Sequence, residues 1–286
     1  MEDWYFFSVA ALVLLGTQRF LYKVAAEKRC NSALTTAVFM ATVTLLSAAV
    51  YFASGDPAGN PVPLLVLALL NSSSFAFATI ANIEALRHLP AGITFPLTRL
   101  SLVVVILFSV LYFGERPQPL QWFGMLLVTA VVLLLGREAK SHVRIDGNIR
   151  SGLLFVAVCV LCGALASISS KLAVASLGKA GFMTLSYLFA TCFSLAIEKQ
   201  WGQGRAGGRG KQTLLLGMLM GVLNFFGFYA FLTALDGGPL AAVATITGMH
   251  FVFAIVLSVL FYREPMTVRR SLGIVLTLLA VFFLKQ

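Results

Sequence analysis

Ten long apolar stretches dominate this sequence of 286 residues and restrict the folds open to it. A helix needs about 20 mostly apolar residues to cross the roughly 30 Å hydrocarbon core of a bilayer. Backbone groups in lipid must bond to one another, and these stretches lack the alternation of a membrane β-barrel, so helices are expected. The stretches lie at 4–22, 33–53, 62–86, 91–113, 119–136, 151–171, 180–198, 213–235, 239–262 and 267–284.

Charged residues are too few for a surface that faces water on all sides. They make up 11% of the chain, whereas a soluble domain carries about 25%. The net charge of +10 comes from short Lys and Arg clusters between the apolar stretches, which is typical of topology signals and not of a nucleic-acid-binding face. The four cysteines lack the spacing of a metal site. We therefore expect a multi-pass protein of the cell (inner) membrane, in contact with the lipid bilayer, with no nucleic-acid partner, no metal and no cofactor.

An internal repeat divides the chain into two halves of five stretches. A shift of 149 residues aligns them without a gap over the last helices of each half, placing Pro90 on Pro239, Thr98 on Thr247, Glu115 on Glu264 and Gly124 on Gly273. Because five is odd, the second copy enters the membrane from the opposite side, as in secondary transporters with inverted repeats. We predict an all-α membrane protein with ten transmembrane helices, in which residues 1–136 and 151–286 are inverted five-helix repeats and 137–150 is a cytoplasmic linker.

The repeated motifs resemble the EamA-type members of the drug/metabolite transporter superfamily. The fourth stretch of each half ends on a glutamate before a short turn, at Glu115 and Glu264. The other matching residues are Leu111-Tyr112-Phe113-Gly114 and Leu260-Phe261-Tyr262-Arg263, Gly124 and Gly273, Leu89-Pro90-Ala91 and Gly238-Pro239-Leu240, and Lys23 and Lys171. The resemblance implies a duplicated five-helix fold and a transport function, and it implies nothing about the substrate.

Basic residues also predict which side of the membrane each loop occupies, because Lys and Arg concentrate in cytoplasmic loops. With ten spans, both termini lie on one side. That side carries four Lys and Arg residues and the other carries fifteen, once Arg19 and Arg99 inside the spans are left out. The count places the termini outside and the loops at 137–150 and 199–212 in the cytoplasm. The family resemblance implies cytoplasmic termini, and we follow the charges.

Arg99 is the first candidate for a binding residue. It lies about nine residues into its span, near the bilayer centre, where an Arg costs at least about 2.5–3.5 kcal/mol and usually faces a cavity or a partner. Its planar fork of donors suits a carboxylate or a phosphate. The alternative is an ion pair with Glu84, near the cytoplasmic end of the third span. We favour the anion anchor.

His250 is the second candidate. It lies about eleven residues into the ninth span, which is the repeat counterpart of the span that carries Arg99. We therefore expect both side chains to approach the same cavity, where His250 would bind substrate or relay a proton. A hydrogen-bonded packing histidine is equally consistent with the sequence.

Neutral polar residues at mid-depth form a second group. Asn71, Ser74, Asn224 and Tyr229 either line the cavity or hold helices together, and the second role is the commoner one. Gly217-x-x-x-Gly221 predicts close helix packing. Gln18 and Arg19 lie near the cytoplasmic end of the first span, where they would form part of a gate, although Arg19 alone can equally extend to the headgroups.

These features predict a secondary transporter, expected to export a small anionic or zwitterionic metabolite by alternating access around a midplane cavity. A flippase for a lipid-linked anionic headgroup is the alternative on the same fold. An intramembrane enzyme is remote, because the sequence has no H-E-x-x-H, no G-x-S-x-G and no pair of intramembrane carboxylates. The sequence leaves both a monomer and a homodimer open.

Overall fold

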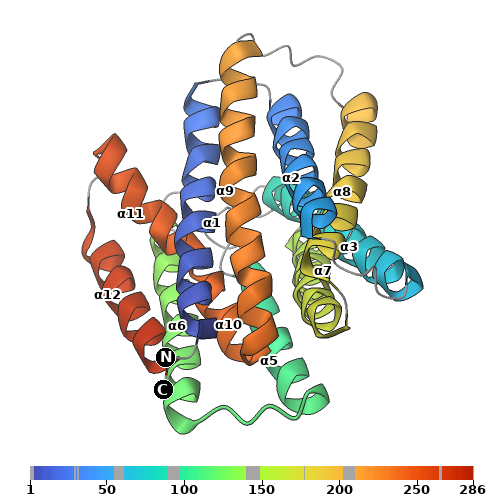
Figure 1. The fold of residues 1–286 in the computed structure, drawn as a ribbon. Helices are drawn as coiled ribbons and strands as arrows, with labels where there is room; N and C mark the ends of the chain where they lie inside the picture. The colour runs from blue at the N-terminus through green and yellow to red at the C-terminus, as the bar shows by residue number, and fades with distance from the viewer. Residues whose placement is uncertain are drawn as a thin grey trace.

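The chain folds into a bundle of long helices that cross one another at varied angles (Figure 1). The computed structural model describes residues 3–28, 30, 32–54, 61–88, 97–139, 149–176, 178–201, 210–263 and 266–285. No strand occurs among them. Their helices are α1 (Asp3–Glu27), α2 (Ser32–Ser54), α3 (Pro61–His88), α5 (Ser101–Tyr112), α6 (Pro119–Ala139), α7 (Ile149–Ser176), α8 (Lys179–Trp201), α9 (Gly210–Gly237), α10 (Leu240–Gly248), α11 (His250–Tyr262) and α12 (Val268–Phe283).

The helices of the two halves pack against each other in matching pairs. The first helix of each half contacts the third helix of the other half, as α1 with α9 and α7 with α3. The two second helices, α2 and α8, contact each other, and so do the two fifth helices, α6 and α12. Exchanging the two halves leaves this set of pairs unchanged. The packing therefore has the two-fold relation that the sequence repeat predicts.

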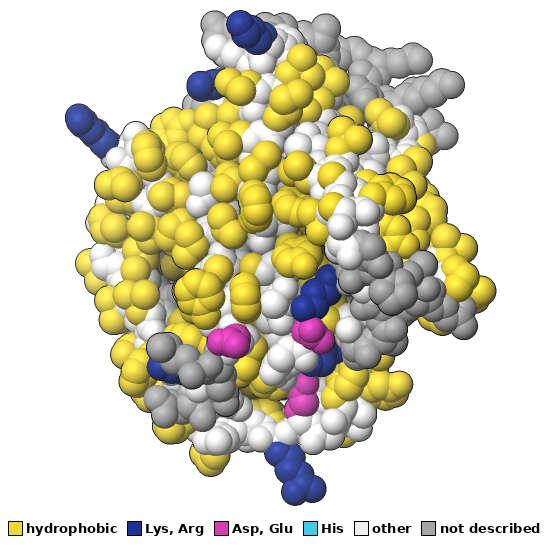
Figure 2. Space-filling model, viewed as in Figure 1, with side chains coloured by type: hydrophobic (Ala, Val, Ile, Leu, Met, Phe, Trp, Pro, Cys, Tyr) yellow, Lys and Arg dark blue, Asp and Glu magenta, His cyan; other side chains and the backbone are white. Residues whose placement is uncertain are grey.

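The outer surface is strongly apolar. Six helical segments are long and apolar enough to cross a membrane, and two shorter apolar helices, Ser101–Tyr112 and Pro119–Leu134, accompany them in the described part of the chain. Figure 2 shows apolar side chains over most of one face, with Lys and Arg mainly toward its ends. Leu111 and Val268, for example, are 82% and 84% exposed. Contiguous apolar surface of this extent is typical of a protein that contacts lipid.

Glycines bring α9 into close contact with its neighbours. A Cβ atom on Gly217 would lie 2.9 Å from the Cβ of Val38, and one on Gly221 would lie 2.5 Å from the Cβ of Thr42, both on α2. The spacing of Gly217 and Gly221 therefore serves helix packing, as the sequence predicts. Further along α9, Gly227 meets α1 in the same way.

The two ends of the chain lie at the same end of the bundle (Figure 1). The hydroxyl of Tyr5 donates to the carbonyl oxygen of Val281 at 3.3 Å, and the ammonium of Lys285 lies 5.7 Å from the centre of the Tyr5 ring. We call this end of the bundle, where the α9–α10 turn also lies, the terminal end.

Candidate functional site

Both fourth helices are interrupted at the same place in the repeat. The sequence predicts spans at 91–113 and 239–262, with Pro96 able to kink or open the first of them. In the second, α10 ends at Gly248 and α11 begins at His250, with Met249 between them. In the first half, Arg99 and Leu100 form a turn before α5 begins at Ser101. At both interruptions a backbone nitrogen donates to the carbonyl oxygen three residues earlier, as in a 3-10 helix: Leu100 N to Leu97 O at 3.0 Å, and Met249 N to Ile246 O at 3.1 Å. In secondary transporters, the substrate site is typically formed by interrupted membrane helices.

The two interruptions meet near the centre of the bundle. A Cβ atom on Gly248 would lie 3.1 Å from a methyl carbon of Leu102, so α10 and α5 cross there in close contact. The first helices of the two halves support the crossing, since Gly16 of α1 abuts the carbonyl oxygen of His250 and Gly163 of α7 faces the side chain of Ser101. Each interrupted helix is therefore held by the first helix of the other half.

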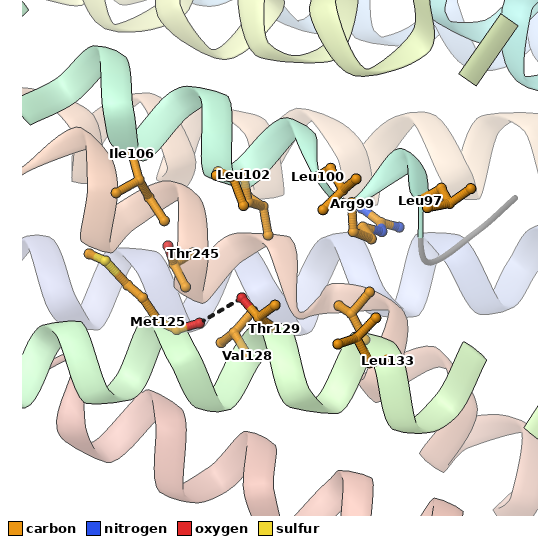
Figure 3. Close-up of a pocket in the computed structure, with 12 residues that line it drawn as sticks. Leu97, Arg99, Leu100, Leu102, Ile106, Met125, Val128, Thr129, Leu133 and Thr245 are labelled. Carbon is orange, nitrogen blue, oxygen red and sulfur yellow. Dashed lines mark hydrogen bonds between the residues drawn. The ribbon is translucent and has the colours of Figure 1, made fainter. Parts of the chain in front are cut away.

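A small cavity lies beside this crossing, between α5, α6 and α10. Its volume is about 50 Å³, and its walls are mainly Leu and Val, with hydroxyl groups from Thr129 and Thr245. Figure 3 shows Arg99 beside Leu97 and Leu100 at one end of the cavity, while Thr245 projects from α10 between the α5 and α6 side chains. Sequence reasoning did not identify either threonine.

Arg99 supplies a positive charge to the lining of this cavity. Its guanidinium carbon lies 5.0 Å from the centre of the Phe251 ring, within the range of a cation–π interaction. No carboxylate that the structure describes is within salt-bridge distance of it. The side chain of Glu84, the alternative partner, lies outside the described residues. Among the described residues, Arg99 therefore has the Phe251 ring as a neighbour and no carboxylate partner.

His250 lies close to two positive charges and has one free ring nitrogen. Its Nδ1 donates to the carbonyl oxygen of Thr247 at 2.8 Å, across the interruption. Its Nε2 is buried and has no hydrogen-bond partner among the described residues. Both Arg99 and the exposed Arg19 interact electrostatically with the imidazole. Arg19 and Arg99 thus create positive potential around His250, whose Nε2 is a buried polar atom with no partner among the described residues.

A chain of buried polar side chains runs next to this region. The hydroxyl of Tyr187 on α8 donates to Oδ1 of Asn224, and the Asn224 amide donates to Oε1 of Gln18 at 2.9 Å. Gln18 in turn donates to the hydroxyl of Tyr22 at 3.4 Å. Gln18 is only 5% exposed, so its amide lies in the interior of the bundle. Tyr187 was missed, because the packing of α8 on α9 has no local trace in the sequence.

Asn71 is committed to helix packing. Its amide donates to the carbonyl oxygen of Ala166 and to the hydroxyls of Ser169 and Ser170, all on α7, at 2.8 to 3.1 Å. The neighbouring Ser72 bonds to the carbonyl oxygen of Ser186 on α8. These bonds leave the Asn71 amide nitrogen no free hydrogen for a substrate and favour the packing role over the cavity-lining role.

Replacement of Asn71 distinguishes the two roles. We expect Asn71→Ala to lower the unfolding free energy by about 0.6–2 kcal/mol, the range of polar contacts between membrane helices, without changing ligand binding. Thermal unfolding of the purified protein measures the first quantity, and the shift in Tm on ligand addition measures the second. Ser73→Ala is the matched control, because the one hydrogen bond described for the Ser73 side chain lies within its own helix. A large loss of ligand binding with unchanged stability would assign Asn71 to the site.

The remaining predicted residues, Ser74 and Tyr229, have no described hydrogen bond to Arg99 or His250. Ser74 is buried on α3 at 4% exposure. Tyr229 is 37% exposed and stacks on Phe225, and it makes no hydrogen bond to Arg99 or His250. The structure therefore brings together Arg19, Arg99 and His250, with Gln18 and Asn224 beside them.

The arrangement of matched helix pairs around two interrupted helices defines a class, the multi-pass membrane transporters built from repeats. The family model for the EamA-like transporter family matches residues 3–137 and again 150–285, which together cover most of the chain. The chain therefore belongs to the EamA-like transporter family, as its motifs predict.

Individual similarities agree with this assignment. A Sinorhizobium protein described as an uncharacterized transporter in the cobO 3' region is 26% identical over 137 residues, which are 47% of this chain and 96% of that protein. A solved structure described only as the crystal structure of a protein matches with a TM-score of 0.79 at 16% identity. It covers 98% of this chain and 95% of its own, so the likeness shows that the fold extends over the whole length.

Proposed function

We propose that this protein is a secondary transporter that exports a small anionic metabolite across the cell (inner) membrane. Ten spans, with α10 and α11 as the two parts of one span, would form the inverted repeats. The substrate would bind where the interrupted helices cross, and each repeat would move relative to the other to expose the site to one side at a time. The family membership supports transport as such.

The observation that carries the anionic assignment is the unpaired state of Arg99 among the described residues. A guanidinium near the middle of a membrane helix usually faces a partner or a cavity. Here it lines a cavity whose walls come mainly from α5 and α6 of the first half, with Thr245 from the second half, and the described charged group that acts on it, Arg19, is also cationic. A carboxylate or a phosphate would satisfy the guanidinium in a bidentate way and lower the mutual repulsion of the positive charges.

The size of the cavity supports a conformational change. A site for a small molecule usually occupies about 300–1,000 Å³, whereas this cavity measures about 50 Å³. It accepts water-sized groups only, so a metabolite would require α5, α6 and α10 to separate. A cycle between open and closed states would include such a separation of helices.

A thermal-shift screen on purified protein tests the proposal, because a ligand that binds the native state raises Tm by mass action. We expect carboxylates and phosphates to raise Tm, and amines and neutral sugars to leave it unchanged. Uptake by proteoliposomes would then identify which binders are carried. A screen in which only cations or neutral molecules stabilise the protein would refute the anionic assignment.

A further inference from the structure

The terminal end of the bundle is closed by polar contacts that the transport site does not use. The carboxylate of Glu115 accepts hydrogen bonds from the backbone nitrogen of Leu240 at 2.6 Å and from that of Ala241 at 3.2 Å, and it also binds the hydroxyl of Ser109. Glu115 follows α5 in the first half, whereas Leu240 and Ala241 begin α10 in the second half. The carboxylate therefore caps a helix that belongs to the opposite repeat.

Two lysines hold the α9–α10 turn, to which Glu115 binds. The ammonium of Lys171 donates to the carbonyl oxygens of Leu235 and Gly238, at 2.5 and 2.7 Å, where α9 ends. The ammonium of Lys179 forms a salt bridge of 2.8 Å with Asp236. Both lysines belong to the second half, so they fix the α9–α10 turn from within that half and present its backbone N–H groups to Glu115.

A buried aromatic side chain closes the same end from the first half. Trp4 is 7% exposed, and a Cβ atom on Gly238 would lie 2.8 Å from its ring. The indole therefore lies directly against the α9–α10 turn, and only glycine leaves room for it. Trp4, like Glu115, holds the turn across the boundary between the repeats.

We propose that Glu115 acts as a latch at the terminal end of the bundle. Its carboxylate holds the start of α10 and must release it before the transport site opens toward that end. This inference rests on the alternating-access part of the proposed function. α10 has nine residues and ends at the interruption beside His250, so it can pivot as a short rod about Met249. Its first backbone N–H groups carry positive partial charge, which the Glu115 carboxylate stabilises only while the two repeats touch.

Side-specific labelling of a cysteine behind the latch tests this role. Thr245 is 1% exposed, lines the cavity and lies one turn beyond the latched end of α10. We would introduce Thr245→Cys after replacing Cys30, Cys159, Cys162 and Cys192 by alanine, and add a membrane-impermeant methanethiosulfonate from the terminal side of oriented proteoliposomes. With Glu115 present, labelling should be slow, because the thiol is sealed from that side.

Removal of the latch should accelerate that labelling. We expect Glu115→Ala to raise the rate by on the order of tenfold or more, because charged hydrogen bonds hold the closed state. Glu115→Gln should raise it less, since the amide oxygen still accepts one bond. Arg116→Gln is the matched control and should leave the rate unchanged, because Arg116 is exposed and makes no contact with α10 among the described residues.

Thermal unfolding of each variant separates gating from misfolding. If Glu115→Ala fails to fold, Glu115→Gln carries the test. An unchanged labelling rate in a folded Glu115 variant, or acceleration only from the opposite side, would reduce Glu115 to a structural cap and overturn the proposal. No ligand is needed, so a failed anion screen with accelerated labelling would remove the substrate assignment and leave the gate intact.

Discussion

Replacement of Arg99 by alanine should abolish binding of the anionic substrate while the protein stays folded in the membrane. Truncating one partner of a buried, hydrogen-bonded charge pair costs about 2–5 kcal/mol, which corresponds to about 30-fold to several thousandfold in affinity. No described carboxylate would lose its partner in the empty protein, and the repulsion from Arg19 would fall. The loss should therefore appear mainly in ligand-induced Tm shifts and in proteoliposome uptake, whereas the Tm of the ligand-free protein should fall only by the loss of the Phe251 contact.

Two further variants sharpen this expectation. Arg99→Lys keeps the charge but loses the planar fork, so it should retain part of the binding if charge dominates and little if bidentate contact dominates. Arg116→Ala removes an exposed arginine of the same repeat and should bind normally. Wild-type affinity and uptake in Arg99→Ala would remove Arg99 from the site.

Gly221→Ala should strongly destabilise the protein. The added methyl would lie 2.5 Å from the Cβ of Thr42 and 3.0 Å from the carbonyl oxygen of Phe39, both on α2. Neither the β-branched side chain of Thr42 nor the helix backbone at Phe39 can move aside easily, so α9 and α2 must move apart. Overpacking of this kind costs about 1–3 kcal/mol. Thermal unfolding in detergent measures the loss, and the population of folded protein after extraction should fall with it.

A second glycine provides the matched control. Gly163 lies inside α7, and its nearest neighbour for an added Cβ is the Ser101 side chain at 3.5 Å, an ordinary contact distance. Gly163→Ala should be neutral or slightly stabilising, because alanine favours helix over glycine by about 1 kcal/mol. Equal Tm values for Gly221→Ala and Gly163→Ala would show that α2 and α9 are not packed as closely as described.

Much of the fold was predictable from the sequence because lipid imposes strong rules. The apolar stretches located every described helix, and the 149-residue repeat predicted a pseudo-two-fold relation between the two halves, which the symmetric set of helix pairs fits. A kink or opening of the first of the two interrupted helices was predictable from Pro96, which lies three residues before Arg99 and cannot donate a backbone hydrogen bond. The interruption at Met249 was not predicted, although Gly248 beside it is a residue that weakens a helix interior.

The candidate site was predictable only in part. Intramembrane charge and the repeat together identified Arg99 and His250, because a central ionisable residue is costly unless it has a role. The bonds of Asn71 to α7 and the chain from Tyr187 to Gln18 depend on which helix faces which, and periodicity carries no such information. The capping of α10 by Glu115 joins residues 125 positions apart, and local sequence patterns carry no information about such a contact.

The inversion of the two repeats can be measured without knowing the substrate. Residues 116 and 263 follow the fourth span of each half in the repeat, so inversion requires them to face opposite sides of the membrane. Cysteines introduced as Arg116→Cys and Arg263→Cys in the cysteine-free protein should react with an impermeant thiol reagent from opposite sides, with position 116 outside and position 263 in the cytoplasm by the distribution of basic residues. Labelling of both positions from the same side would contradict the inverted arrangement on which the proposed transport cycle depends.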